Sequence, residues 1–290
     1  MTEHELGVLL RLLGLRPRRL GGQWLCLCPA HDDHVPSLTA RATSEGRVLV
    51  CCHAGCAGRS VLAALGLLGH ACEQRFSAPR ARRVEPPDPG VAREWAAIAG
   101  ADSNGQVEEH ERELGIPGSG LRRLGAVWSG RHAALAVPMY DRIGGQLVGV
   151  RLRYDDGRKR ALRGSHNGLF APPACGDRGA LFLPEGMTDT AALLGLGLDA
   201  VGRPSCNGGR ELVRAALRGT RRLIVVVTDA DEPGRRGAEL LASELVADGV
   251  RVKIVGPPPG KKDVRESIRA GVTAAALNYM VRSTACCKGQ

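Results

Sequence analysis

The chain has 290 residues, of which 43% are hydrophobic, and it carries 40 Lys and Arg against 30 Asp and Glu. At about 150 residues per domain, this length predicts two domains with room for a small third module, and the apolar content excludes a largely disordered chain. No apolar run approaches the roughly 18 residues of a membrane span, and the N-terminus has no secretory signal, so we expect a cytoplasmic protein without membrane contact. The net charge of +10 predicts a polyanionic partner such as nucleic acid.

Half of the 10 cysteines fall between positions 26 and 56. Cysteines stay reduced in the cytoplasm, so this concentration predicts metal binding rather than disulfides. Two residues separate Cys28 from His31, and three separate Cys52 from Cys56. Each pair can place two soft donors on one tight turn, and two such pairs can form a tetrahedral Zn2+ site.

The residues between the two pairs have the composition of a β-hairpin, with strands over residues 37–43 and 47–50. This hairpin would bring the pairs together. A site with four protein ligands is closed and therefore structural, so the folding of residues 1–75 should depend on the metal. The spacing leaves the ligand set open, because four neighbours could replace a ligand: Cys26, His34, Cys51 and His53.

Residues 28–38 (CPAHDDHVPSL) and 52–56 (CHAGC) resemble the zinc-binding domain of bacterial-type and of phage or plasmid primases. The resemblance implies that the zinc ligands are Cys28, His31, Cys52 and Cys56. It also implies that this module contacts a single-stranded DNA template and helps to choose where synthesis begins.

Residues 76–90 are rich in proline and arginine and lack apolar periodicity, which predicts a semi-extended linker. Residues 91–127 are predicted to be helical and carry no motif. Short strands are then predicted over residues 134–140, 146–154 and 159–163. Six basic and two acidic residues lie within residues 151–163. Because strand alternation puts Arg151 and Arg153 on one face, the segment predicts a surface that binds nucleotides or phosphates rather than a merely solvated face.

From residue 180 onward, short apolar runs alternate with amphipathic stretches. The predicted strands are residues 180–184, 223–228 and 250–255, and the predicted helices are residues 188–196 (capped by Thr188), 210–218, 233–247, 263–270 and 273–282. This alternation predicts an α/β fold with a mostly parallel sheet covered on both faces. Sites in such sheets form at the carboxyl ends of the strands.

Acidic residues follow each of these three strands: Glu185, then Asp229 and Asp231, then Asp263. One such residue alone commonly belongs to a turn or a helix cap. Several carboxylates at one sheet edge repel one another unless a divalent cation lies among them, and oxygen ligands that leave positions for water and phosphate suit Mg2+. The sequence therefore predicts a metal site at this edge, and Asp189 either belongs to it or lies on the polar face of the first helix.

The run Glu185-Gly-Met-Thr-Asp189, followed by Asp229-Ala-Asp231, resembles the TOPRIM domain of primases, topoisomerases and some nucleases. Residues 138–170 resemble the primase subdomain that precedes TOPRIM, and there the resemblance implies that Arg151 and Lys159 face the metal site. The implied order is a small zinc-ribbon domain at residues 1–75, the linker, a mixed α+β primase subdomain at 91–177, and an α/β TOPRIM domain at 178–285.

The resemblance implies a DNA primase that makes short RNA primers on single-stranded DNA from NTPs by nucleotidyl transfer, with Mg2+ or Mn2+ at the catalytic site. The implied catalytic residues are Glu185, Asp229, Asp231, Arg151 and Lys159, with Asp263 and Asp189 beside the metal. The chain ends soon after the TOPRIM part, which implies a compact phage- or plasmid-encoded form and a separate replicative helicase. The alternatives are a TOPRIM-family nuclease and a non-catalytic DNA-binding replication accessory.

Overall fold

The computed structural model describes residues 1–20, 22–34, 36–52, 54, 56–67, 88–101, 105–176, 179–205 and 208–287. The chain divides into two compact units, Met1–Arg83 and Val84–Gln290. Most of the predicted linker lies outside the described residues, and its last residues, 88–90, lead into and begin a helix. In the described part of the chain, no helix combines the length and the apolar character needed to cross a membrane.

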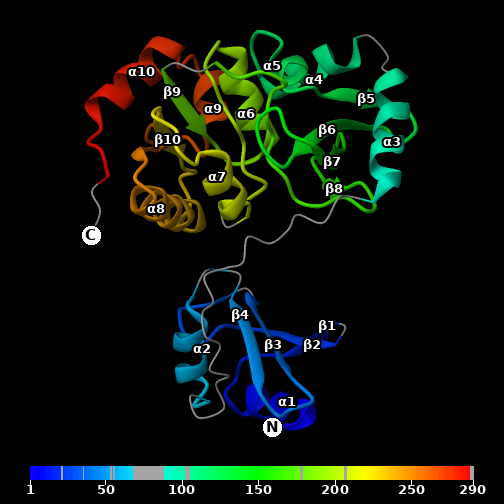
Figure 1. Ribbon diagram of the computed structural model, residues 1–290, viewed down its shortest axis with the longest axis vertical. Helices are drawn as coiled ribbons and strands as arrows, with labels where there is room; N and C mark the ends of the chain where they lie inside the picture. The colour runs from blue at the N-terminus through cyan, green and yellow to red at the C-terminus, as the bar shows by residue number, and fades with distance from the viewer. Residues whose placement is uncertain are drawn as a thin grey trace. The chain divides into compact units, whose positions relative to one another are not determined.

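The first unit is an antiparallel sheet of four strands that follow one another in chain order, with one helix before the sheet and one after it (Figure 1). Its elements are α1 (Glu3–Leu12), β1 (Arg18–Leu20), β2 (Gln23–Cys26), β3 (Leu38–Ala42), β4 (Val48–Cys52) and α2 (Gly58–Ala64). The predicted hairpin is β3 and β4, and its register pairs Leu38 with Cys52. A capping box begins α1, because the Thr2 hydroxyl accepts from the Glu5 amide while the Glu5 carboxylate accepts from the Thr2 amide.

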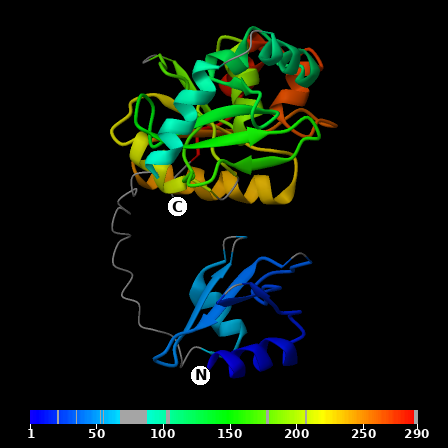
Figure 2. The same ribbon diagram turned by 90° about the vertical axis from the view of Figure 1, so that its right-hand side faces the viewer.

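The second unit begins with three helices and a second antiparallel sheet, again in chain order. Its elements are α3 (Pro89–Gly100), α4 (Gln106–Leu114), α5 (Gly120–Arg123), β5 (Val127–Ser129), β6 (Ala134–Tyr140), β7 (Leu147–Arg153) and β8 (Lys159–Ala161). Figure 2 shows α3 lying across the strands of this sheet. Val91 and Ile98 of α3 share a core cluster with Ala136 and Val150, so the helix closes one face of the sheet.

The rest of the second unit is a parallel three-stranded sheet in the order β11-β10-β9, with helices between the strands. Its elements are β9 (Ala180–Leu183), α6 (Gly186–Gly195), α7 (Arg210–Ala216), β10 (Leu223–Val227), α8 (Glu232–Ala247), β11 (Arg251–Val255), α9 (Val264–Arg269) and α10 (Ala274–Ser283). The mixed α/β architecture predicted from the sequence is confirmed. The prediction that Thr188 caps the first helix of this part is wrong. Helix α6 begins two residues earlier, at Gly186, and its N-cap is Glu185, whose backbone is extended.

Helices cover both faces of the parallel sheet. Ile224 and Val226 of β10 belong to a core cluster with residues of α7 and α8, whereas Val225 and Val227 belong to a second cluster with residues of α6, α9 and α10. A strand that is buried on both faces has no polar side, which explains the uninterrupted apolar run of residues 223–227. The acidic residues nearest to β10 in sequence, Asp229 and Asp231, therefore follow its carboxyl end.

Helix α6 joins the two halves of the second unit. All residues from Met187 to Leu194 are buried, and Figure 1 shows the helix between the two sheets. Two glycines allow a close approach of backbones here, because a methyl group at Gly120 would overlap the carbonyl of Ala191 and one at Gly195 would overlap the carbonyl of Pro117. One core cluster contains residues of both halves, so they pack as one unit.

Candidate functional site

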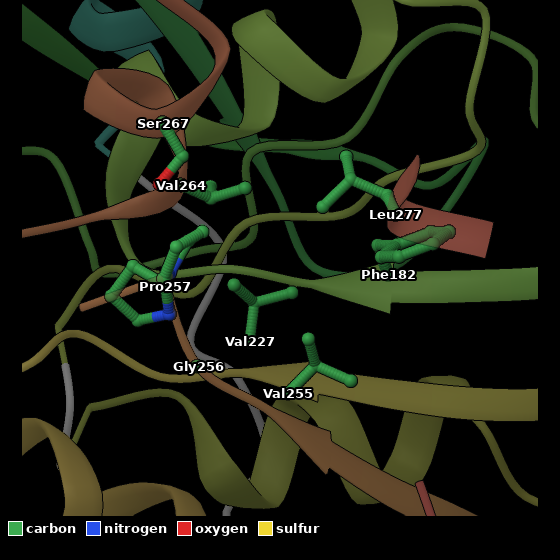
Figure 3. A pocket seen from close by; sticks show the side chains of 9 residues that line it. Phe182, Val227, Val255, Gly256, Pro257, Val264, Ser267 and Leu277 are labelled. Carbon is green, nitrogen blue, oxygen red and sulfur yellow. The ribbon is translucent and has the colours of Figure 1, made fainter. Parts of the chain in front are cut away.

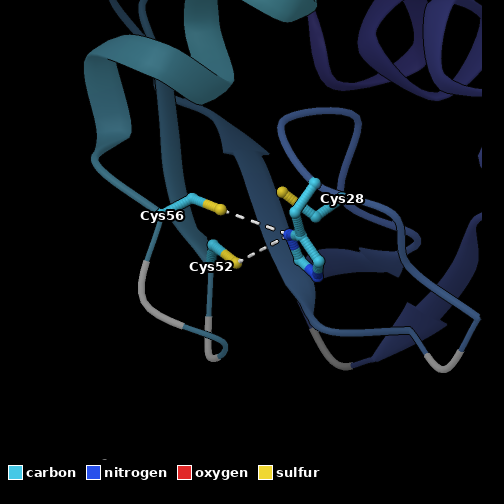
Figure 4. Close-up of side chains that lie close together, drawn as sticks. Cys28, Cys52 and Cys56 are labelled. Atoms are coloured by element: carbon cyan, nitrogen blue, oxygen red, sulfur yellow. Dashed lines mark hydrogen bonds between the residues drawn. The ribbon is translucent and has the colours of Figure 1, made fainter. Parts of the chain in front are cut away.

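The structure brings together the four residues of the predicted zinc set in the first unit. Cys28 and His31 lie in the loop after β2, Cys52 ends β4, and Cys56 lies just before α2. One donor atom from each residue lies within 4.8 Å of all the others. Nδ1 of His31 lies 3.2 Å from Sγ of Cys56 and 3.9 Å from Sγ of Cys52 (Figure 4). Three sulfurs and one imidazole nitrogen at this separation fit a tetrahedral Zn2+ ion.

Asp33 connects the cluster to its loop. Its Oδ2 atom accepts hydrogen bonds from the Cys28 amide at 2.7 Å and from the Ser37 hydroxyl at 2.6 Å. Its Oδ1 atom lies 3.7 Å from Nε2 of His31, which leaves Nδ1 as the nitrogen that faces the sulfurs. A carboxylate behind a ligating histidine fixes the ring and the tautomer that binds the metal. This role of Asp33 was not predicted from the sequence, although Asp33 lies only two residues after the predicted ligand His31.

The thiols of the cluster differ in acidity. Burial raises the pKa of Cys28 to about 12. Burial also opposes ionisation of Cys52, but hydrogen bonds from the Cys56 backbone and from Ser37 bring its pKa below the ordinary value. Cys52 therefore loses its proton more readily than Cys28, and the thiolate is the form that binds a metal.

Three of the four residues that could have replaced a zinc ligand are described, and none of them belongs to the Cys/His cluster. Cys26 is fully buried in the core of the first unit, and burial raises its pKa to about 11. Cys51 is exposed and points away from Cys52, as neighbours on a strand do. His34 is exposed and lies 3.5 Å from Asp32. The fourth alternative, His53, lies outside the described residues.

In the second unit, the carboxyl ends of β9, β10 and β11 carry the predicted acidic residues. We call this set the acidic edge: Glu185, Asp189, Asp229, Asp231 and Asp263. Glu185 precedes α6, and Asp231 and Asp263 cap α8 and α9 by accepting from the amides of Gly234 at 2.8 Å and Glu266 at 2.7 Å. Each capping carboxylate uses one oxygen in this way. The other oxygen of Asp231 stays available to a cation, whereas the other oxygen of Asp263 lies 3.7 Å from Nη2 of Arg265.

The carboxylates of the acidic edge repel one another. Burial raises the pKa of Asp229 to about 6, and repulsion from Glu185, Asp263 and Asp231 adds to this effect. Asp189 is only 5% exposed, and burial raises its pKa well above the ordinary value, with further repulsion from Asp263 and Asp229. Mutual repulsion among carboxylates fits a divalent cation between them.

Basic residues of the antiparallel sheet face the acidic edge. Arg153 of β7 lies opposite Lys159 of β8 in the strand register. Partial desolvation and then Arg153 lower the pKa of Lys159, whereas Asp189 and Glu185 act in the opposite direction. Lys159 therefore lies in the electrostatic field of the acidic edge. Burial lowers the pKa of Arg153, and repulsion from Arg265 of α9 adds to this, so Arg153 also faces this region.

Arg151, the second predicted basic residue, lies two pairs further along the strand, opposite Ala161, and donates to Oδ1 of Asn167 at 3.1 Å. Burial lowers its pKa. The residue opposite Lys159 is Arg153. Arg153 was predicted to share a strand face with Arg151, but it was not predicted to be a site residue. Strand alternation carried that signal.

A buried arginine, Arg203, and a small apolar pocket lie behind the acidic edge. Arg203 is only 1% exposed, its guanidinium donates to the carbonyl of Val227 at 3.5 Å, and its backbone forms a bridge with Glu185. It therefore ties the end of β9 to the end of β10. A pocket of about 10 Å³ lies nearby and has apolar walls that include Val227, Val255 and Phe182 (Figure 3). A pocket of this size holds about one water molecule and has no place for a substrate.

Comparisons with known proteins agree with this geometry. Residues 182–268 match a Toprim-like domain family, and this stretch contains every residue of the acidic edge. The second unit therefore carries a Toprim-like domain. A search of curated protein sequences found no match.

The fold of the chain is that of a bacterial-type primase. It is similar to the crystal structure of the zinc-binding and RNA polymerase domains of the Aquifex aeolicus primase, with a TM-score of 0.54 and 13% identity over 96% of this chain and 83% of that chain. It is also similar to the structure of the DnaG catalytic core, with a TM-score of 0.53 and 14% identity over 68% of this chain and 79% of that chain. At these identities the likeness is one of fold.

Proposed function

We propose that this chain is a DNA primase that synthesises short RNA primers from NTPs on single-stranded DNA. The observation that carries the proposal is the acidic edge opposed by Arg153 and Lys159, within a fold shared with primase zinc-binding and polymerase domains. Such an arrangement supplies negative ligands for a cation and positive groups for phosphates on opposite sides of one site.

Glu185, Asp229 and Asp231 would hold Mg2+ or Mn2+. Burial, and then repulsion from neighbouring carboxylates, raises the pKa of Asp229, and a divalent cation would offset both effects, which supports this assignment. When bound, the cation supplies neutralisation of the triphosphate and acidification of the attacking hydroxyl. Asp263 and Asp189 lie beside this position, and both pair with Arg265.

Lys159, Arg153 and Arg151 would bind the phosphates of the incoming nucleotide and of the template. In the transfer, the 3′-hydroxyl of one nucleotide attacks the α-phosphorus of the next, a phosphodiester bond forms, and pyrophosphate leaves. The fixed cations stabilise the charge that develops on the phosphoryl oxygens. These three residues would position the phosphates and stabilise their charge, which are the main requirements of phosphoryl transfer.

The Cys/His cluster would hold a structural Zn2+ that orders its loops, and the first unit would bind the template where synthesis begins. A replicative helicase would supply the single-stranded DNA that is copied, and the enzyme would act in the cytoplasm. The net charge of +10 suits a polyanionic template.

The test is primer synthesis on a library of single-stranded templates with radiolabelled NTPs. Asp231→Asn keeps the cap of α8, because asparagine also accepts the Gly234 amide, but it removes one carboxylate from the acidic edge. We expect this variant to lose dinucleotide synthesis. Asp248→Asn is the matched control, since Asp248 follows the other end of the same helix and pairs with Arg214.

The same assay separates the alternatives. Cleavage of labelled single-stranded DNA without primer synthesis would indicate a nuclease. Template binding with neither activity would indicate a non-catalytic accessory protein. Full primer synthesis by Asp231→Asn would refute the assignment of the acidic edge.

A further inference from the structure

An arginine lies among the carboxylates of the acidic edge. The guanidinium of Arg265, on α9, has Nε 4.0 Å from Oδ1 of Asp189 and Nη2 3.7 Å from Oδ2 of Asp263. Its Nη1 donates to the carbonyl of Leu114 at 2.9 Å. The side chains of Arg265, Asp189 and Asp263 are only 23%, 7% and 13% exposed. The guanidinium is therefore a fixed cation held between two carboxylates, and a backbone contact from α4 fixes its position.

Asp189 depends on this cation. Its Oδ1 atom is buried and accepts no hydrogen bond from the described residues. Two further carboxylates, Asp229 and Asp263, repel it. An ionised carboxylate in such surroundings needs a positive partner, because desolvation of an unpaired charge is costly. Arg265 is the cation that the structure places beside it.

Asp263 is also occupied. Its Oδ1 atom accepts from the Glu266 amide at 2.7 Å, and its Oδ2 atom is the one that faces Arg265. The two carboxylates nearest Arg265 therefore already have positive or donor partners. In the described part of the chain, Glu185, Asp229 and Asp231 form no ion pair with Arg265. Mg2+ is usually held by one or two protein carboxylates together with water and phosphate, so three carboxylates suffice for one ion.

We propose that Arg265 acts as a built-in cation in the position that a second metal ion would take, so that the acidic edge binds one divalent cation per chain. In sites with two metals the ions lie about 3.5–4 Å apart, and the second ion also needs carboxylate ligands, whether shared with the first or not. Here Arg265 neutralises Asp189 and Asp263, and its positive charge repels a second divalent ion from them. The inference rests on the proposed function, since it requires that the acidic edge binds a divalent cation at all.

The stoichiometry of Mn2+ binding tests the inference without reference to activity. The full chain, loaded with zinc, is titrated with Mn2+ at pH 7.5, and free Mn2+ is followed by electron paramagnetic resonance. We expect one Mn2+ per chain. Arg265→Met should bind two, because Asp189 and Asp263 then lack a cation, whereas Arg265→Lys should bind one. Arg269→Met is the matched control, because Arg269 lies one turn further along α9, is exposed and packs against Gly115.

The outcomes separate the two proposals. Two Mn2+ in the unaltered chain would overturn this inference and leave the metal site of the proposed function intact, whereas none would refute the metal site itself. A folded Arg265→Met chain that still binds one Mn2+ would also overturn the inference. If Arg265→Met does not fold, Asp189→Asn decides: it should bind one Mn2+ with affinity within about twofold of the unaltered chain, since Asp189 serves Arg265 rather than the metal. Loss of Mn2+ binding in that variant would overturn the inference.

Discussion

Asp229→Asn should stabilise the protein in the absence of magnesium while it abolishes the proposed catalysis. The pKa of Asp229 is about 6 in the folded chain against an ordinary value of 3.8, because burial and three neighbouring carboxylates disfavour its charge. Folding is therefore favoured by the protonated form, and this contribution is lost as the pH rises from about 4 to about 6. Asparagine is neutral at every pH and keeps the favourable state.

The size of the effect follows from the shift. At about 1.4 kcal/mol per pKa unit, the difference between the two values corresponds to about 3 kcal/mol. Asp229 is only partly buried, so solvent screening reduces this to about 1–2 kcal/mol. For a unit of this size we expect the melting temperature at pH 8 to rise by about 3–6 °C. At pH 4 most of the gain should disappear, because the carboxylate is then protonated in the folded chain and about half protonated in the unfolded chain.

The measurement is thermal unfolding followed by circular dichroism in magnesium-free buffer at pH 4, 6 and 8. Asp248→Asn is the control of opposite sign, because hydrogen bonds with Arg214 lower the pKa of Asp248, so that its loss should not stabilise the chain at pH 8. Added Mg2+ should raise the melting temperature of the unaltered chain but not that of Asp229→Asn. A variant that is no more stable than the unaltered chain at pH 8, or equally stabilised at pH 4, would refute the electrostatic reasoning.

Four further predictions concern other parts of the molecule. Cys52→Ser should release zinc, measured by a chromogenic chelator, whereas the exposed Cys51→Ser should retain it; equal retention would contradict the ligand set. Asp33→Asn should weaken zinc binding by about 10- to 100-fold in competition with the chelator, with unchanged affinity as the contrary result. Gly120→Ala should cost about 2–4 kcal/mol in chemical denaturation, because the new methyl group meets the Ala191 carbonyl, whereas Gly100→Ala has open space and should cost nothing. Since only 3% of the residues are aromatic, single-stranded DNA binding should fall steeply with salt, and a flat salt dependence would contradict the reliance on phosphate contacts.

The parts of the fold and the site that could be predicted are those with local signals. The spacing of Cys28, His31, Cys52 and Cys56 reflects two tight turns, and the structure brings these four residues together. The apolar run of β10 followed directly by Asp229 likewise reflects one buried strand and its carboxyl end. Such signals lie within a few residues of one another, so they are visible in one dimension.

The parts that could not be predicted depend on contacts between distant residues. Arg265 reaches the carbonyl of Leu114 across 151 positions, and nothing in the local sequence of α9 indicates this contact. Arg203 is an arginine in a loop, which ordinarily predicts exposure, yet it is among the largest fully buried side chains. Thr188 has the chemistry of a helix cap but lies inside α6, because the helix begins directly at the end of β9.

The buried helix α6 has a practical consequence for work with separate parts of the protein. A polypeptide cut at residue 178 would keep the whole match to the Toprim-like family but would lose Leu121, Leu135 and Phe170, which share a core cluster with α6. One side of a helix whose residues from Met187 to Leu194 are all buried would then meet water, and an exposed core surface promotes aggregation. Expression of the catalytic part alone should therefore start before α3, because the family match is shorter than the piece that can fold.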